Sequence, residues 1–211
     1  MSTVIVSGAI ANKCLNGGEA WVRLSYVCGL RKLGFKVYFV EQINGDDCVG
    51  PNGASARFEQ STNLAYFKSV VDQFGLSDSS VLTLGGEQTF RLPFEEVLKI
   101  AESTDLLINI TGHLRLEPFL RRIRRKMYID LDPGFTQFWH EAGNTGAHLE
   151  GHDFYFTVGE NIGAPGLCEF DNGLLDSPSL LDFIGLDMLS LLQTTVRSSA
   201  AGPRMAIVVS G

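Results

Sequence analysis

Polar residues that could do chemistry follow short apolar runs at several places in this chain. One set is Thr111, Gly112 and His113, directly after the run 106–110. A histidine at the carboxyl end of a strand can act as a general base or orient a donor group beside a ligand. A histidine in a solvated loop is the simpler interpretation, and both stay open here.

A second set of polar groups is carried by the segment YIDLDPGFTQF. Asp130 and Asp132 are two residues apart, so an extended backbone places them on one side. Asp132 could bind hydroxyl groups of an acceptor at the rim of a sheet, whereas Asp130, deeper in it, is expected to bind neighbouring backbone N–H groups. The aromatic residues Phe135, Phe138 and Trp139 are expected to pack rather than to form a platform for a sugar.

Two further apolar runs end in polar residues. Glu41 follows the run 35–40, and Glu160 and Asn161 follow the run 154–158. The carboxyl ends of parallel strands meet at one edge of a sheet, and ligands bind there. These three residues are therefore candidates for the rim of a binding site.

The N-terminal segment has a glycine pair at the start of a predicted helix. The run Thr3–Ser7 predicts a buried strand, and a loop then leads to Asn16, Gly17, Gly18 and Glu19. Unpaired N–H groups and the helix dipole at such a position favour a phosphate or a carboxylate. The full GxGxxG fingerprint is absent, so the glycines can equally serve only the turn from strand to helix.

The elements that must position these groups alternate between strand and helix. Strands are predicted over 3–7, 35–40, 81–84, 106–110, 127–131 and 154–158, and helices over 19–33, 61–74, 93–104 and 116–125. Such alternation predicts an α/β fold: a single Rossmann-like three-layer domain with a mainly parallel sheet of about six to seven strands.

Composition excludes several classes of protein. A chain of 211 residues suits one sizeable α/β domain, and a net charge of −7 argues against a nucleic-acid surface. The four cysteines form no CxxC pair and the histidines are scattered, so we expect no metal site. No apolar run is long enough to span a bilayer, and the N-terminus lacks the features of a signal peptide. We therefore expect no transmembrane segment and a cytoplasmic location.

Two segments, NGGEAWVRLSY and GLRKLGFKVYFVE, resemble a known family. Their glycine pair, helix and following strand are similar to the start of the nucleotide-sugar glycosyltransferases of the GT-B fold. In that family this loop faces a cleft between two Rossmann-like domains, near the sugar diphosphate and the acceptor. The resemblance covers residues 1–163, although Phe35 stands where the family often has a histidine.

The resemblance implies that this chain is the acceptor-side half of an enzyme that transfers a sugar from a nucleotide-sugar to an acceptor. The family often has a histidine after this strand, beside the reacting sugar, and His113 matches it by position. The resemblance thus implies catalytic roles for His113 and Asp132, phosphate contacts for the loop Asn16–Glu19, and no cofactor.

Beyond Gly163 the resemblance is lost, and residues 164–211 are expected to add a helical extension with an edge strand. The second Rossmann-like domain, which holds the nucleotide in the family, does not follow in this sequence. We expect either that a second chain supplies it or that this is a truncated product, inactive by itself.

Two other classes of function stay open. A small Rossmann-like protein could bind a nucleotide for regulation without catalysis, and the fold alone permits this. An inactive remnant of an enzyme is the other class. The residues do not indicate the donor, the acceptor, or whether transfer would be retaining or inverting.

Overall fold

The computed structural model describes residues 2–143, 146, 148–158 and 204–207. The chain divides into two compact units, and each is described by itself. The first unit comprises Met1–Ile108 and His113–Arg124, and the second comprises Asn109–Gly112 and Arg125–Gly211. Both units contain parallel strands linked by helices, which confirms the predicted α/β fold.

The first unit holds most of the secondary structure. Its strands are β1 (Thr3–Ser7), β2 (Lys36–Ile43), β3 (Ser80–Leu84), β4 (Gln88–Phe90) and the first part of β5 (Leu106–Ile110). Its helices are α1 (Gly17–Lys32), α2 (Thr62–Gln73), α3 (Phe94–Glu102) and α4 (Glu117–Leu120), with short 3-10 turns η1 (Gly45–Asp47) and η2 (Phe58–Gln60).

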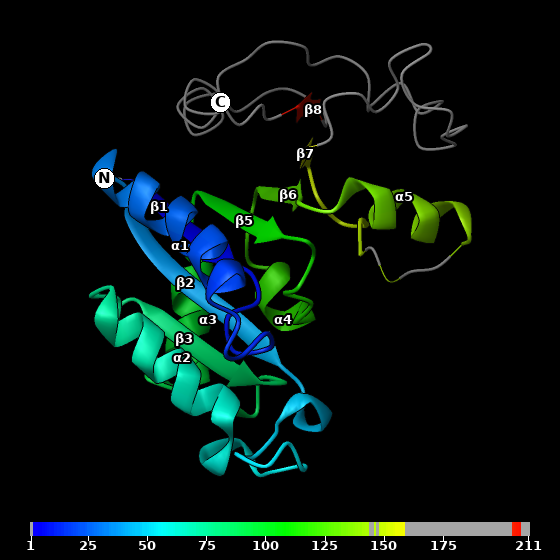
Figure 1. Cartoon of the computed structure of the whole chain (residues 1–211). Coiled ribbons are helices and arrows are strands. Elements are labelled where there is room, and N and C mark those ends of the chain that lie inside the picture. Colours follow the sequence, from blue (N-terminus) through cyan, green and yellow to red (C-terminus); the bar gives the residue numbers. More distant parts are fainter. Residues whose placement is uncertain (1, 144–145, 147, 159–203, 208–211) are drawn as a thin grey trace. The chain divides into compact units, whose positions relative to one another are not determined.

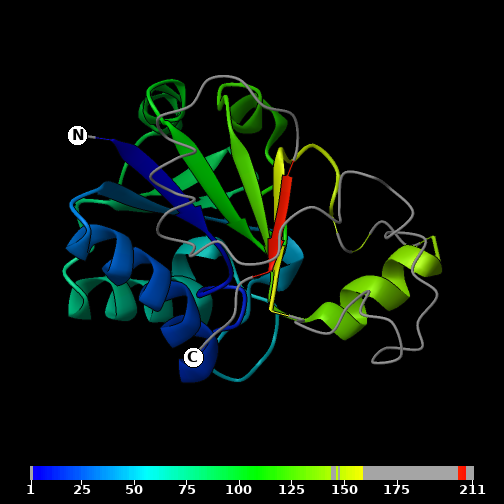
Figure 2. The same ribbon diagram turned by 90° about the horizontal axis from the view of Figure 1, so that it is seen from above.

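The strands of the first unit follow the order β4-β3-β2-β1-β5. Strand β2 runs parallel to both neighbours, with Val37 opposite Val4 and Val40 opposite Val81. Only β4 pairs antiparallel, with β3. Helices α1 and α2 cover one face of these strands and α3 and α4 the other, as Figures 1 and 2 show. This is the predicted three-layer arrangement.

A hydrophobic core fills the face under α3 and α4. Its buried residues come from four strands, from α3 and from the segment around α4: Ile5, Val40, Val81, Val97, Leu98, Ala101, Leu107, Leu114, Phe119 and Ile123. Strands β1, β2 and β3 each contribute one residue to this core. Alternate side chains of a strand point to opposite faces, so their neighbours in the strand face the other side. Leu114 belongs to this core, so the segment just after His113 is anchored.

Several predicted elements of the first unit have other bounds, and α1 begins at Gly17 instead of residue 19. Strand β2 continues to Ile43 instead of ending at residue 40, so Glu41 lies inside the strand. The helix predicted over 116–125 is only the short α4, because the chain then forms i→i−3 turns, in which Arg122 N donates to Phe119 O. These turns bring Ile123 into the core.

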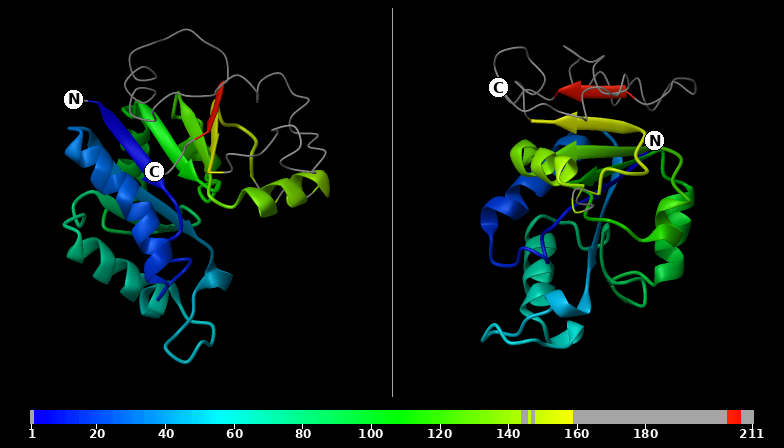
Figure 3. Two further views of the ribbon diagram at one scale, coloured as in Figure 1. Left: turned by 45° about the horizontal axis from the view of Figure 1, so that its top comes forward. Right: turned by 90° about the vertical axis from the view of Figure 1, so that its right-hand side faces the viewer.

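The second unit continues β5 and adds β6 (Lys126–Asp130), α5 (Pro133–Glu141), β7 (Phe154–Thr157) and β8 (Arg204–Ile207). Its strands follow the order β5-β6-β7-β8, and β7 is parallel to β6 and to β8. Figure 3 shows β7 and β8 side by side. Strand β8 lies in the segment that was expected to add an edge strand, whereas α5 was not predicted.

Several predictions fall on residues outside the described ranges. Glu160, Asn161, the boundary near Gly163 and the predicted helical extension are among them, and they stay predictions. Within the described ranges, every helix is too short or too polar to cross a lipid bilayer.

Candidate functional site

The loop between β1 and α1 is held by Glu41. This side chain is fully buried, and its Oε2 accepts hydrogen bonds from the backbone nitrogens of Ile10 and Ala11, both at 2.9 Å. Its Oε1 accepts from Asn12 N at 2.8 Å. Glu41 was a candidate for the ligand-binding rim, but its carboxylate is bound to the protein's own loop. The N–H groups of residues 10–12 are therefore not open to a ligand.

Burial also changes the acidity of Glu41. Loss of water raises the pKa of its carboxyl group to about 7 from an ordinary 4.5. The three backbone N–H bonds and the charge of Arg23 act in the opposite direction and offset only part of this effect.

Asn63 fixes the same loop from another side. Its Nδ2 donates to Ala11 O at 2.9 Å, and its Oδ1 accepts from Val49 N at 2.9 Å. The side chain thereby ties the loop after β1 to the segment after β2. A role for Asn63 was not predicted from the sequence. Its signal is a polar residue at helical spacing from buried Phe67 and Val70, on an otherwise apolar face of α2.

The start of α1 is the part of this loop that stays accessible. Asn16 is the N-cap, and its Oδ1 accepts from Glu19 N at 3.2 Å. No acceptor among the described residues meets the N–H groups of Gly17 or Gly18. A Cβ atom at Gly17 would have nothing within 4 Å, and one at Gly18 would meet only Asn16 Oδ1, at 3.5 Å. The protein's own packing therefore does not require these glycines, and space is left beside their backbone.

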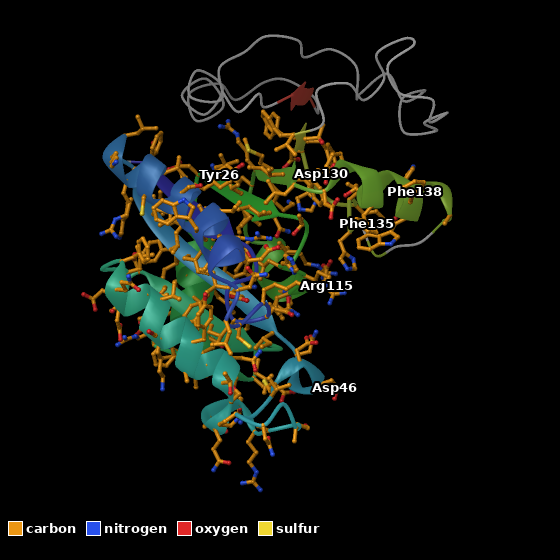
Figure 4. The ribbon with its side chains drawn as sticks, viewed as in Figure 1. Tyr26, Asp46, Arg115, Asp130, Phe135 and Phe138 are labelled. Carbon is orange, nitrogen blue, oxygen red and sulfur yellow. The ribbon has the colours of Figure 1, made fainter. Side chains whose placement is uncertain are left out.

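The segment after β5 carries His113 in the first unit. His113 is half-buried, and its neighbours Gly112 and Leu114 are buried. Two residues further on, Arg115 N donates to Gln42 Oε1 at 2.9 Å, which joins this segment to the end of β2. Figure 4 shows the exposed side chains of Arg115 and, on η1 after β2, of Asp46. The first unit thus holds the loop Asn16–Glu19, Glu41 and His113 on loops or strand ends at its carboxyl edge.

Asp130 organises the second unit. It is 6% exposed, and its Oδ1 accepts from Thr136 Oγ1 at 2.8 Å and from Asp132 N at 3.0 Å. Its Oδ2 accepts from Thr157 Oγ1 at 3.1 Å. Burial raises the pKa of this carboxyl group, and the hydrogen bonds lower it by less. The expectation that Asp130 binds a neighbouring backbone N–H is confirmed.

Asp132 differs from Asp130 in being exposed. It is the N-cap residue of α5 but makes no side-chain cap hydrogen bond. Its carboxylate is therefore the accessible one of the pair, as a group that binds acceptor hydroxyls would have to be.

The backbone conformation at Thr111 and Gly112, and the packing around Gly112, restrict which residues can stand there. Both have a positive φ, 53° and 64°, which is uncommon for a β-branched residue such as Thr111. A Cβ at Gly112 would lie 2.8 Å from His148 Cβ and 3.1 Å from Tyr128 Cε2. Gly112 is thus required by packing and backbone conformation, whether or not a ligand binds nearby.

A partly buried pair of polar side chains in the second unit, His152 and Asn109, was not predicted. His152 Nδ1 lies 3.1 Å from Leu149 O, and its Nε2 lies 3.1 Å from Asn109 Nδ2. A carbonyl only accepts, so Nδ1 carries the proton and Nε2 accepts from Asn109. Burial lowers the pKa of His152 and favours this neutral form. The signal in the sequence is the polar Asn109 within the apolar run LLINI.

The prediction that the aromatic residues after β6 pack into the protein is wrong. Phe135, Phe138 and Trp139 lie on α5 and are 57%, 51% and 42% exposed. Figure 4 shows Phe135 and Phe138 on this helix. Phe135 and Trp139 contact each other, with ring centroids 5.9 Å apart. The cause is α5 itself, because an unpredicted helix presents these rings on its own surface.

Comparison with known proteins adds no family to this description. No protein-family model matches the chain, and no curated protein matches it.

Proposed function

We propose that this chain provides the acceptor-side half of a glycosyltransferase that uses a nucleotide-sugar donor. The observation that carries the proposal is the start of α1, where Gly17 and Gly18 have open N–H groups and no steric need to be glycine. Backbone N–H groups at a helix start bind phosphate well, and a missing Cβ allows the close approach that a diphosphate needs. The resemblance of the surrounding segments to the GT-B family agrees with this position.

The role of Glu41 argues against a simple dinucleotide-binding protein. In Rossmann domains that bind dinucleotides, an acidic residue after the second strand binds the ribose hydroxyls. Glu41 stands at that place, but its two oxygens already accept three backbone N–H groups of the β1–α1 loop. The geometry therefore favours a site for phosphate and acceptor, with the nucleoside held by another domain or chain.

The transfer would join the acceptor oxygen to the anomeric carbon of the sugar, while the bond from that carbon to the diphosphate oxygen breaks. The proton of the acceptor hydroxyl would go to a base, for which His113 is the candidate. Asp132 belongs to the second unit, and its binding of acceptor hydroxyls stays a prediction from the sequence. The open N–H groups of Gly17 and Gly18 would stabilise the negative charge on the leaving diphosphate.

The test is nucleoside diphosphate release from UDP-, GDP- and dTDP-sugars with and without a candidate donor-binding chain. We expect repeated turnover only with the second chain, because it holds the nucleotide and excludes water from the reacting sugar. His113→Ala should abolish this turnover, whereas His140→Ala, at an exposed position on α5, should not. Repeated turnover by the isolated chain would reject the division between two halves.

A further inference from the structure

Arg23 is a buried cation in the second turn of α1. The residue is only 5% exposed, and its Nη1 donates to the Glu19 carboxylate and to Glu19 O, the latter at 3.4 Å. The guanidinium therefore lies back along the helix toward its first turn. Its Nε is buried and has no acceptor in the part of the chain that the structure describes. Arginine keeps its charge in proteins, and a buried N–H without a partner is costly.

The first two turns of α1 thus carry one cation and two open donors. The N–H groups of Gly17 and Gly18 have no acceptor among the described residues, and Glu19 is the next residue along the helix. Glu19 supplies the carboxylate that Arg23 binds directly, and the buried Glu41 also acts on the charge of Arg23. The side chain of Glu19 is 35% exposed, against 7% for Arg23. An exposed carboxylate can move into water at little cost, whereas the buried guanidinium keeps its place.

We propose that Glu19 occupies the place of a ligand anion, and that a phosphate or pyrophosphate group displaces its carboxylate from Arg23. The bound anion lies between the guanidinium and the N–H groups of Gly17 and Gly18. The identity of the ligand, the diphosphate of a nucleotide-sugar, rests on the proposed function. The anion site itself is inferred from Arg23 and the open N–H groups of Gly17 and Gly18, whatever the ligand is. Glu19 is thereby a competitor of the ligand and Arg23 is its counter-ion.

The proposal predicts that removing a polar side chain from the site raises its affinity for an anion, which is the opposite of the usual effect. A phosphate-binding loop normally loses affinity when one of its polar residues is changed. Here Glu19→Gln removes the competing charge, leaves the guanidinium to the ligand and ends a like-charge repulsion. The amide oxygen of glutamine can still accept from Arg23 Nη1, and position 19 is partly exposed, so the variant is expected to fold.

The experiment is a titration of the folded full chain with inorganic pyrophosphate, followed by amide chemical shifts. Glu19→Gln should bind roughly five- to tenfold more tightly than the wild type, as expected for one nearby charge. Arg23→Met should bind more weakly, and Glu19→Gln should give no gain in its presence. The matched control is Glu95→Gln, which removes a carboxylate from the first turn of α3.

Unchanged or weaker binding by Glu19→Gln overturns the proposal, and so does a gain that persists in Arg23→Met. If Arg23→Met does not fold, Arg23→Gln replaces it, because glutamine also removes the charge but keeps a polar side chain beside Glu19. An equal gain in Glu95→Gln would show a general charge effect and also overturn it. If Glu19→Gln tightens pyrophosphate binding while no sugar transfer occurs, the anion site stands and the proposed function fails.

Discussion

The carboxylate of Glu41 lies 2.9 Å from the backbone nitrogen of Ile10, 31 residues away in the chain. This contact joins the end of β2 to the loop after β1. Together with the bonds to Ala11 and Asn12, it replaces a ligand as the partner of the loop's N–H groups. The loop is therefore folded before anything binds, and the start of α1 is held in place.

Glu41→Gln is expected to destabilise the protein. The amide nitrogen of glutamine cannot accept a hydrogen bond, so at least one of the three backbone N–H groups loses its partner inside the protein. A buried donor without a partner costs about 1–3 kcal/mol. Urea unfolding near neutral pH measures the difference, and Glu59→Gln, at an exposed position, is the control. Equal stability of Glu41→Gln and the wild type would contradict the structural role.

The raised pKa of Glu41 predicts a pH dependence of the free energy of unfolding. The folded protein holds this proton up to a pH of about 7, whereas the unfolded chain releases it near 4.5. The folded state thus binds more protons between these values, and its stability falls as pH rises through this window. The full effect is roughly 3 kcal/mol.

Unfolding at about pH 5 and about pH 8 tests this prediction. The wild type should lose more stability between the two than Glu41→Gln, which lacks the titrating group. Other shifted groups, such as Asp130 and His152, are present in both proteins and cancel in the comparison. A wild type and a variant with parallel pH profiles would show that Glu41 does not titrate in this range.

Asn63→Leu should unfold more easily, because Val49 N and Ala11 O both lose a partner. The expected loss is about 1–3 kcal/mol, for polar groups left unpaired in the interior. Asn52→Leu is the control, since Asn52 is exposed and bonds only to Ala54 N within its own turn. A loss no larger than that of the control would show that the loop after β1 does not depend on Asn63.

Gly112 and Gly143 offer a matched test of packing. Their φ angles are 64° and 66°, but a Cβ would meet His148 at 2.8 Å in the first case and nothing within 4 Å in the second. Gly143→Ala should cost about 1–2 kcal/mol for the left-handed conformation alone. Gly112→Ala should cost more than this, measured by thermal unfolding. Equal costs would mean that the contact with His148 is not tight.

The strands were predictable because their apolar, β-branched runs are local signals. The extension of β2 was not, since Glu41 and Gln42 are polar. Their partners are distant in the sequence: the loop after β1 for Glu41 and Arg115 N for Gln42. Helix α5 was missed because Asp132-Pro133-Gly134 is typical of a turn, although proline is also favoured in the first turn of a helix.

The candidate site was predictable only where one segment carries the signal. The glycine pair and the N-cap Asn16 are neighbours in sequence, and a helix start could be expected there. Arg23, Asn63 and Asn109 acquire their roles from partners that the fold brings to them, or from burial that no short segment reveals. Gly112 likewise depends on His148, which no local pattern links to it.

The central claim is that the start of α1 binds the diphosphate of a nucleotide-sugar. Charge-assisted contacts of about 1.5–3 kcal/mol each must offset an association cost of at least about 4 kcal/mol, so binding to this chain is expected to be on the order of millimolar. Gly18→Val should abolish it. Gly29→Val, in the last turn of the same helix, where a Cβ has nothing within 4 Å, should not.

The most direct measurement is a titration of the ¹⁵N-labelled chain with UDP-, GDP- and dTDP-sugars, followed by the backbone amide shifts. The account predicts that the amides of Gly17, Gly18 and Glu19 shift together, with one weak dissociation constant, for at least one of these donors. Saturating shifts elsewhere with none at these three amides would contradict it, as would undiminished binding by Gly18→Val.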